Sequence, residues 1–189
     1  MTVKIHIKEI ADIQTGVYLK ETPDGGVNYL QVKDFGKDAF PILSPPSIDL
    51  DDKVKKYLLS DGNLLFAAKG FFNFCVVYRE EWGRAVASSS FLVLNIKNTT
   101  AILPEYLNWI LNRDDVRACF QRETAGSVMP SVTKVMLGEF EINIPTMDVQ
   151  QKIIAISGLQ KREQVLNKEI AELRNQLINK QIIEILTNK

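Results

Sequence analysis

The stretch VQQKIIAISGLQKREQVLNKEIAELRNQLINKQIIEI, residues 149–185, decides the fold of the C-terminal part of this chain. Its apolar residues recur mostly at steps of three, four or seven, which is the spacing of a coiled-coil seam. No proline follows Pro145, and Gly158 is the only glycine after it, so one helix can run through the whole stretch. About 40 residues rising 1.5 Å each predict a rod of roughly 60 Å.

The apolar stripe of this rod can be buried in two ways. A preceding domain of about 147 residues is too small to cover all of it, which favours pairing with a helix of a second chain. The alternative is a helix that lies partly along its own domain. After Leu177 the stripe moves to Ile178, a register shift within the seam. We expect the pairing face to consist of Ile153, Leu166, Ile170, Leu173, Leu177 and Ile182.

The whole chain has an ordinary globular composition. It contains 189 residues, 46% hydrophobic and 24% charged, so most of it is expected to be ordered. No apolar run reaches the roughly 18 residues of a membrane span, and the N-terminus lacks the apolar core of a signal peptide. Cys75 and Cys119 are interpreted as reduced core thiols of a cytoplasmic protein. We expect two domains, residues 1–147 and 148–189.

Strand and helix patterns alternate within residues 1–147. A short strand, one or two helical turns and a turn near Gly16 open the domain. Pro104 is expected to begin a helix, because its missing N–H is no loss at that position. A hairpin is expected through Lys69 and Gly70. The predicted strands are 27–32, 63–68, 71–78, 84–96 and 139–144, with a second helix over 114–124.

The motifs of common enzyme classes are absent. His6 is the only histidine, and with two distant cysteines it cannot complete a zinc site of the usual spacing. Ser131-Val-Thr-Lys134 matches Ser-x-x-Lys but lacks the companion motifs of serine acylases. No glycine-rich phosphate loop occurs, and Gln31 replaces the carboxylate that a Pro-Asp nuclease motif would need after Pro23-Asp24. The sequence predicts a non-catalytic binding module without metal or cofactor.

Four stretches together resemble a known family. They are Ile7–Gly16, Leu59–Gly70, Leu103–Leu107 and, most clearly, Gly126–Pro145 followed by Gln150-Gln-Lys-Ile-Ile154. Their order and spacing are similar to the specificity subunit of type I restriction-modification systems. Family members usually hold two halves, each with one target-recognition domain and one conserved helix, and this chain resembles one half.

The resemblance implies a fold class and a set of partners. The fold would be α+β: a mixed α/β target-recognition domain over residues 1–147, with a curved, largely antiparallel sheet, followed by one coiled-coil-forming helix. The domain would read one half of a split site in double-stranded DNA. The helix would dock methyltransferase subunits, and restriction subunits through them. We expect a homodimer with the helices antiparallel, as the family arranges its two conserved helices.

Charge argues neither strongly for DNA nor against it. The chain has 23 basic and 23 acidic residues, of which residues 1–147 hold 16 and 18. DNA affinity would therefore have to be concentrated on one face. The near-neutral charge favours an alternative, a protein-interaction module whose rod assembles a complex without touching DNA. A third alternative, a nuclease or methyltransferase fragment, is disfavoured by the missing motifs.

Candidate DNA contacts are polar residues on or near predicted turns. Lys69 lies beside a turn glycine, Asn73 could pair with adenine, and Arg79 could present its guanidinium to a base or phosphate. Phe71, Phe72 and Phe74 are expected in the core rather than stacked on bases. The full set of expected contacts is Lys20, Lys33, Lys69, Asn73, Arg79, Arg84 and Lys134.

Overall fold

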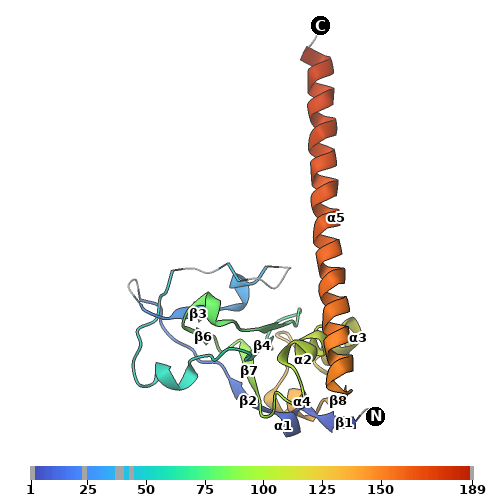
Figure 1. Ribbon diagram of the computed structural model, residues 1–189. Helices are drawn as coiled ribbons and strands as arrows, with labels where there is room; N and C mark the ends of the chain where they lie inside the picture. Colours follow the sequence, from blue (N-terminus) through green and yellow to red (C-terminus); the bar gives the residue numbers. More distant parts are fainter. Residues whose placement is uncertain (1–2, 23–24, 37–40, 43–44, 188–189) are drawn as a thin grey trace. The chain divides into compact units, whose positions relative to one another are not determined.

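The computed structural model describes residues 3–22, 25–36, 41–42 and 45–187 (Figure 1). The chain divides into two compact units, Met1–Gln150 and Gln151–Lys189. The strands are β1 (Val3–His6), β2 (Ala11–Thr15), β3 (Asn28–Leu30), β4 (Leu64–Ala67), β5 (Cys75–Val77), β6 (Ala85–Ala87), β7 (Phe91–Ile96) and β8 (Glu141–Ile144). The helices are α1 (Ile7–Ile10), α2 (Pro104–Leu111), α3 (Asp114–Glu123), α4 (Lys134–Glu139) and α5 (Met147–Thr187), with 3-10 turns η1 (Val32–Asp34), η2 (Val54–Tyr57) and η3 (Glu80–Trp82).

The strands of the first unit form three sheets. Four strands are ordered β2-β7-β4-β5, and all of their pairings are antiparallel. The first and last strands, β1 and β8, form a second antiparallel pair. The third sheet is a parallel pair of β3 and β6. The prediction of an α+β fold with a largely antiparallel sheet followed by one long helix is therefore confirmed.

Three local predictions were wrong. Residues 11–15 form strand β2, because the alternation of buried Ala11 and Ile13 with exposed neighbours is the period of a strand. Residues 84–96 do not form one continuous strand, since β6 leaves the four-stranded sheet to pair with β3. A short helix, α4, occupies Lys134–Glu139, where no element was predicted, and Thr133 caps it by accepting a hydrogen bond from Met136 N–H.

The predicted hairpin between β4 and β5 has the right pairing but a longer connection. The two strands are antiparallel, yet β5 begins only at Cys75. Asn73 explains the delay, because its side-chain amide donates to the Ala67 carbonyl over 2.9 Å and takes the place of a ladder bond. The segment 68–72 therefore leaves the sheet and forms a loop, with Gly70 at a φ of 103°.

Gly16 ends β2 at a close backbone approach. Its N–H donates to the Phe91 carbonyl over 2.9 Å. A Cβ at this position would lie 2.1 Å from the backbone oxygen of Ser88, which is closer than atoms can pack. Only glycine fits at this point of the chain, which gives a physical reason for the glycine in the opening stretch Ile7–Gly16.

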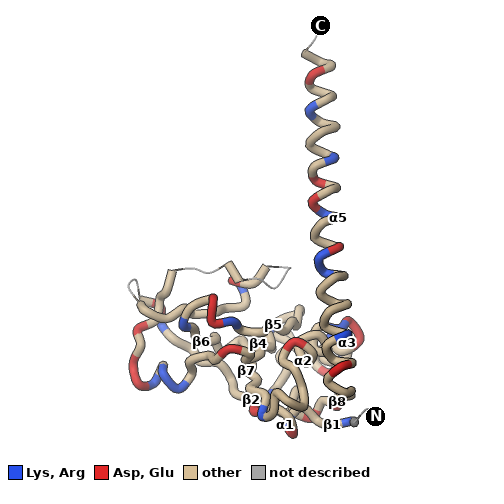
Figure 2. Tube along the Cα trace, in the orientation of Figure 1, with Lys and Arg blue, Asp and Glu red and all other residues tan. Residues whose placement is uncertain are grey.

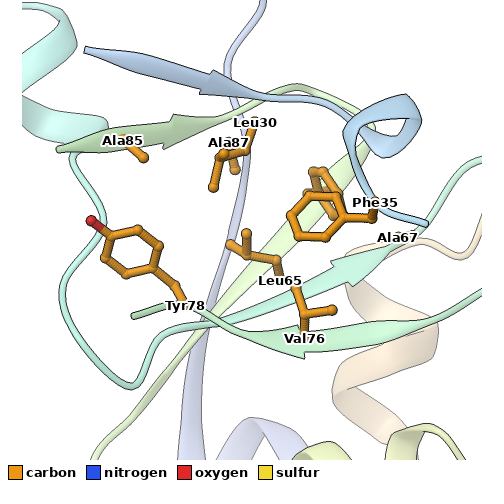
Figure 3. Close-up of a cluster of buried hydrophobic side chains, with 9 residues drawn as sticks. Leu30, Phe35, Leu65, Ala67, Val76, Tyr78, Ala85 and Ala87 are labelled. Atoms are coloured by element: carbon orange, nitrogen blue, oxygen red, sulfur yellow. The ribbon is translucent and has the colours of Figure 1, made fainter. Parts of the chain in front are cut away.

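A buried cluster fixes the β3–β6 pair against the four-stranded sheet. Figure 3 shows Leu30 and Ala87 of that pair facing Leu65 of β4. Its aromatic members make edge contacts: the Phe91 ring lies 5.6 Å from that of Phe35, at an interplanar angle of 77°. The cluster consists of Leu30, Phe35, Leu65, Ala67, Val76, Tyr78, Ala85, Ala87 and Phe91.

Gln150 fastens the start of α5 inside the first unit. The residue is fully buried. Its side-chain oxygen accepts from Leu103 N–H over 3.0 Å, and its side-chain nitrogen donates to the carbonyls of Ala101 and Pro145 over 2.9 and 3.0 Å. A buried amide that meets three backbone groups is a built structural joint. It explains why a glutamine opens the C-terminal stretch Gln150–Ile154.

The rest of α5 confirms the predicted long helix. It runs without interruption to Thr187 (Figure 1), and every residue from Gly158 onward is exposed. All six residues of the expected pairing face lie on it, and Leu166 and Leu173 are 40% and 56% exposed. Among the described residues, no helix is long and apolar enough to cross a membrane.

Candidate nucleic-acid interface

The seven predicted contacts occupy different parts of the first unit. Exposed side chains are found at Lys20, Lys33, Lys69, Arg84 and Lys134. Arg79 is partly buried, and Asn73 is only 2% exposed. Since the Asn73 amide is committed to the Ala67 carbonyl, the residue has a structural role and its side chain does not face a bound duplex.

Arg79 joins two elements through carboxylates. Its guanidinium contacts the Glu105 carboxylate of α2 at 2.5 Å and the Asp61 carboxylate at 3.7 Å. Both partners would have to be released before the guanidinium could turn to a phosphate. The arrangement therefore favours an internal ion-pair role for Arg79 over direct DNA contact.

Lys69 and Lys134 are brought onto one surface by two segments that are distant in sequence. The N–H of Val132 donates to the Ala68 carbonyl over 2.8 Å, and Gly70 N–H donates to the Pro130 carbonyl over 2.9 Å. Lys69 and Ser131 therefore lie opposite each other as an antiparallel bridge. We call residues 68–72 and 126–134 the paired loops; Lys134 is the last residue of the second loop.

Large apolar side chains are exposed on the paired loops. Phe71 and Phe72 are 76% and 60% exposed, so their expected place in the core was wrong, whereas Phe74 packs against the buried cluster. Val128 and Met129 of the facing loop are also exposed. The Arg117 guanidinium lies over the Phe72 ring, 5.2 Å from its centroid. The paired loops thus combine exposed aromatic rings with cationic groups.

A groove of about 550 Å³ adjoins Lys134. The exposed face of β2 and β7 contributes to its lining, and residues 56–60, which follow and overlap η2, contribute another part. Its polar lining is rich in amides and hydroxyls, with one lysine from each of two elements. The polar and charged residues that line it are Asp12, Gln14, Thr15, Lys56, Ser60, Asn63, Asn95 and Lys134.

Strand register places the amides of this groove. Asp12 lies opposite Asn95, and Gln14 lies opposite Val93, so their side chains share one face of the β2–β7 pair. Asn63 is nearly buried and donates to the Asn95 side-chain oxygen over 3.3 Å. Sequence analysis missed Gln14, Asn95 and Lys56. The alternation of residues 11–15 was the available signal for Gln14, once that segment is assigned as a strand.

Basic residues also gather around η2. Figure 2 shows blue segments at this turn beside red ones in the preceding residues. Lys55 pairs with Asp52 at 2.9 Å, whereas Lys56 lines the groove. The positive charge available to a polyanion is therefore carried here by single lysines among acidic residues, in keeping with the balanced composition.

The described residues offer no centre for covalent or metal chemistry. No group of three or more His, Cys, Asp or Glu is placed to hold a metal within that part of the chain. Burial raises the pKa of the Cys75 thiol far above its ordinary value, so the thiol stays protonated. Cys119 is only partly buried, so it is not the core thiol that was expected. His6 lies 2.7 Å from the Glu139 carbonyl through Nδ1, a structural contact.

Comparison with known proteins gives one consistent result. The family model described as type I restriction modification DNA specificity domain matches residues 2–187. No curated protein matches the chain. A crystal structure of the type I restriction-modification S subunit from M. genitalium aligns with a TM-score of 0.62 at 14% identity, covering 95% of this chain and 44% of that one.

Two further structures align equally well. The HsdS subunit from Thermoanaerobacter tengcongensis gives a TM-score of 0.64 at 17% identity, covering 90% of this chain and 39% of that one. A chain from a structure on complex assembly and conformational transition of the type I R-M system gives 0.62 at 18%, with coverages of 94% and 43%. At these identities the alignments establish the fold. This chain spans less than half the length of each.

Proposed function

Because the chain belongs to the family of type I restriction modification DNA specificity domains, we propose that it reads one half of a split DNA site for a methyltransferase. The family match over residues 2–187 carries this proposal, since it includes both the recognition domain and α5. In this role the first unit binds the duplex, and α5 docks the methyltransferase subunits. The partners supply the chemistry, which agrees with the absence of a metal-binding group among the described residues.

The surface that we propose faces DNA consists of the paired loops and the groove beside them. Lys69, Lys134 and Lys56 are exposed lysines that suit phosphate contacts, which position a protein on DNA. Gln14 and Asn95 are exposed amides, the side chains that pair with the major-groove edge of adenine. Lys20, Lys33 and Arg84 remain candidates for additional phosphate contacts outside this surface.

Replacing Lys69 or Lys134 with alanine should weaken DNA binding without changing the preferred site. Each lost phosphate contact reduces the slope of log affinity against log salt by about one unit. Fluorescence anisotropy of the complex with its methyltransferase, between low and physiological salt, measures both quantities. Lys4→Ala is the matched control, because Lys4 is exposed on β1 and pairs with Glu141. An unchanged affinity and slope in both variants would remove these lysines from the interface.

Gln14→Ala and Asn95→Ala test base reading in the same assay. A lost base contact should cost about 1–3 kcal/mol on the preferred site and relax the preference at one position. Affinity for unrelated sequences should stay the same. If all four variants bind as the unsubstituted chain does and its binding shows no salt dependence, the alternative of a protein-interaction module is supported instead.

A homodimer should direct methylation to a palindromic split site. Two identical domains related by a two-fold axis read two identical half-sites, spaced on the order of one helical turn. Long-read sequencing of DNA modified by the assembled complex identifies the motif directly. An asymmetric motif would show that a second, different recognition domain works beside this one.

A further inference from the structure

The exposed stripe of α5 has a spacing that reads the same in both directions. Leu166, Ile170, Leu173 and Leu177 follow one another at steps of four, three and four residues. All four are between 40% and 57% exposed. An antiparallel copy related by a two-fold axis between residues 171 and 172 places Leu166 opposite Leu177 and Ile170 opposite Leu173. Every contact in this core of the seam is then apolar.

The next seam position on each side is charged, and the two charges are opposite. Three residues before Leu166 lies Glu163, and three residues after Leu177 lies Lys180. In the antiparallel register Glu163 of one helix faces Lys180 of the other, twice per dimer. In a parallel, in-register pair each would face its own copy, so that two carboxylates and two ammonium groups would be opposed.

Neighbouring charges support the same register. On the same helix, the Glu184 carboxylate lies 4.0 Å from the Lys180 ammonium, so a partner's Glu163 would complete a carboxylate–ammonium–carboxylate cluster. Glu169 and Arg174 flank the seam five residues apart, a spacing that suits a parallel pair. Such flanking pairs are exposed and contribute little, whereas like charges opposed within a seam are strongly unfavourable.

We propose that α5 binds a second copy of this chain in the antiparallel register centred between residues 171 and 172, and that Glu163 and Lys180 select this register. The inference rests on the proposed function, which needs two recognition domains on one site. It adds the partner, the orientation and the residues that fix the alignment. The spacing between the two domains on DNA follows from this register.

Charge reversal tests the proposal in the full-length chain. Glu163→Lys and Lys180→Glu should each weaken the dimer by roughly tenfold or more, and the double variant should regain most of the loss. Lys168→Glu and Glu172→Lys make the same charge changes off the seam and should leave the dimer unchanged. Sedimentation equilibrium measures the dissociation constants, and far-ultraviolet circular dichroism checks that helix content is preserved.

Cysteine cross-linking in a Cys119→Ser background tests the orientation separately. Leu166→Cys combined with Leu177→Cys should give an intermolecular disulfide on mild oxidation. Leu166→Cys alone should not, because the two copies of residue 166 would lie about 11 residues apart, roughly 16 Å along the helix.

Each outcome of these experiments has a definite meaning. Loss in both single charge variants, recovery in the double variant and cross-linking of only the double cysteine variant support the register. Cross-linking of Leu166→Cys alone, or equal dimer affinity in all charge variants, overturns it while leaving DNA recognition intact. An unsubstituted chain that is monomeric at tens of micromolar overturns the pairing itself. The methylation motif tests the proposed function independently of all these results.

Discussion

A Leu173→Asp variant is expected to be a monomer. In the proposed register residue 173 faces Ile170 of the partner, so a two-fold dimer would bury two carboxylates against apolar side chains. Placing an unpaired charge in such an environment costs several kcal/mol, which corresponds to at least about a hundredfold in the dissociation constant. Leu166→Asp should act in the same way. Sedimentation equilibrium from one to a hundred times the dissociation constant of the unsubstituted dimer would reveal the change.

The matched control for this prediction is Asn175→Asp. It adds the same negative charge two residues further along α5 but off the apolar seam, and it should leave the dimer intact. DNA binding gives a second measurement, because separating the two domains should abolish tight binding to a split site while each domain keeps its weaker affinity for a half-site. A Leu173→Asp variant that remains dimeric would place the pairing face elsewhere on α5.

Replacing Gln150 with leucine should strongly destabilise the first unit. Leucine keeps the volume and the helix propensity of glutamine but leaves Leu103 N–H and the carbonyls of Ala101 and Pro145 without their partner. Each buried polar group that loses its partner costs about 1–3 kcal/mol, so the free energy of unfolding should fall by about 3 kcal/mol or more.

Urea denaturation measures this change best in a Leu173→Asp background. Dimerisation would otherwise add a concentration-dependent term to the apparent stability. Gln151→Leu is the control, since the adjacent side chain is exposed and its replacement should change stability by less than about 0.5 kcal/mol. If Gln150→Leu unfolds at the same urea concentration as the control, the three hydrogen bonds do not hold the start of α5.

Long regular patterns made much of the fold predictable. The stripe of α5 continues over many turns, and Pro104 marks the start of α2 at its first residue. The five-residue strand β2 carries too few residues for its alternation to stand out from the turn of α1 before it. The pairing of β6 with β3 could not be predicted either, because it depends on a cluster to which Leu30, Tyr78 and Phe91 contribute from distant segments.

The candidate interface was harder to predict for a similar reason. Lys69 and Lys134 were each expected near DNA, but only the tertiary bridge between Lys69 and Ser131 brings their segments together. The predictions for Asn73 and Phe71 failed together. One amide bonded to the Ala67 carbonyl buries the asparagine and, by ending the strand early, exposes the phenylalanine. A polar residue within an aromatic run can be a strand terminator as readily as a recognition residue.

The bonds that hold the paired loops together have a consequence for how target preference can diverge. They join backbone N–H and carbonyl groups of Ala68, Gly70, Pro130 and Val132, so they are indifferent to the side chains between them. Residues 69 and 131 can therefore be exchanged without dismantling the scaffold that presents them. Such a surface tolerates mutational drift: related chains can acquire new half-site preferences while their folding stability stays nearly constant.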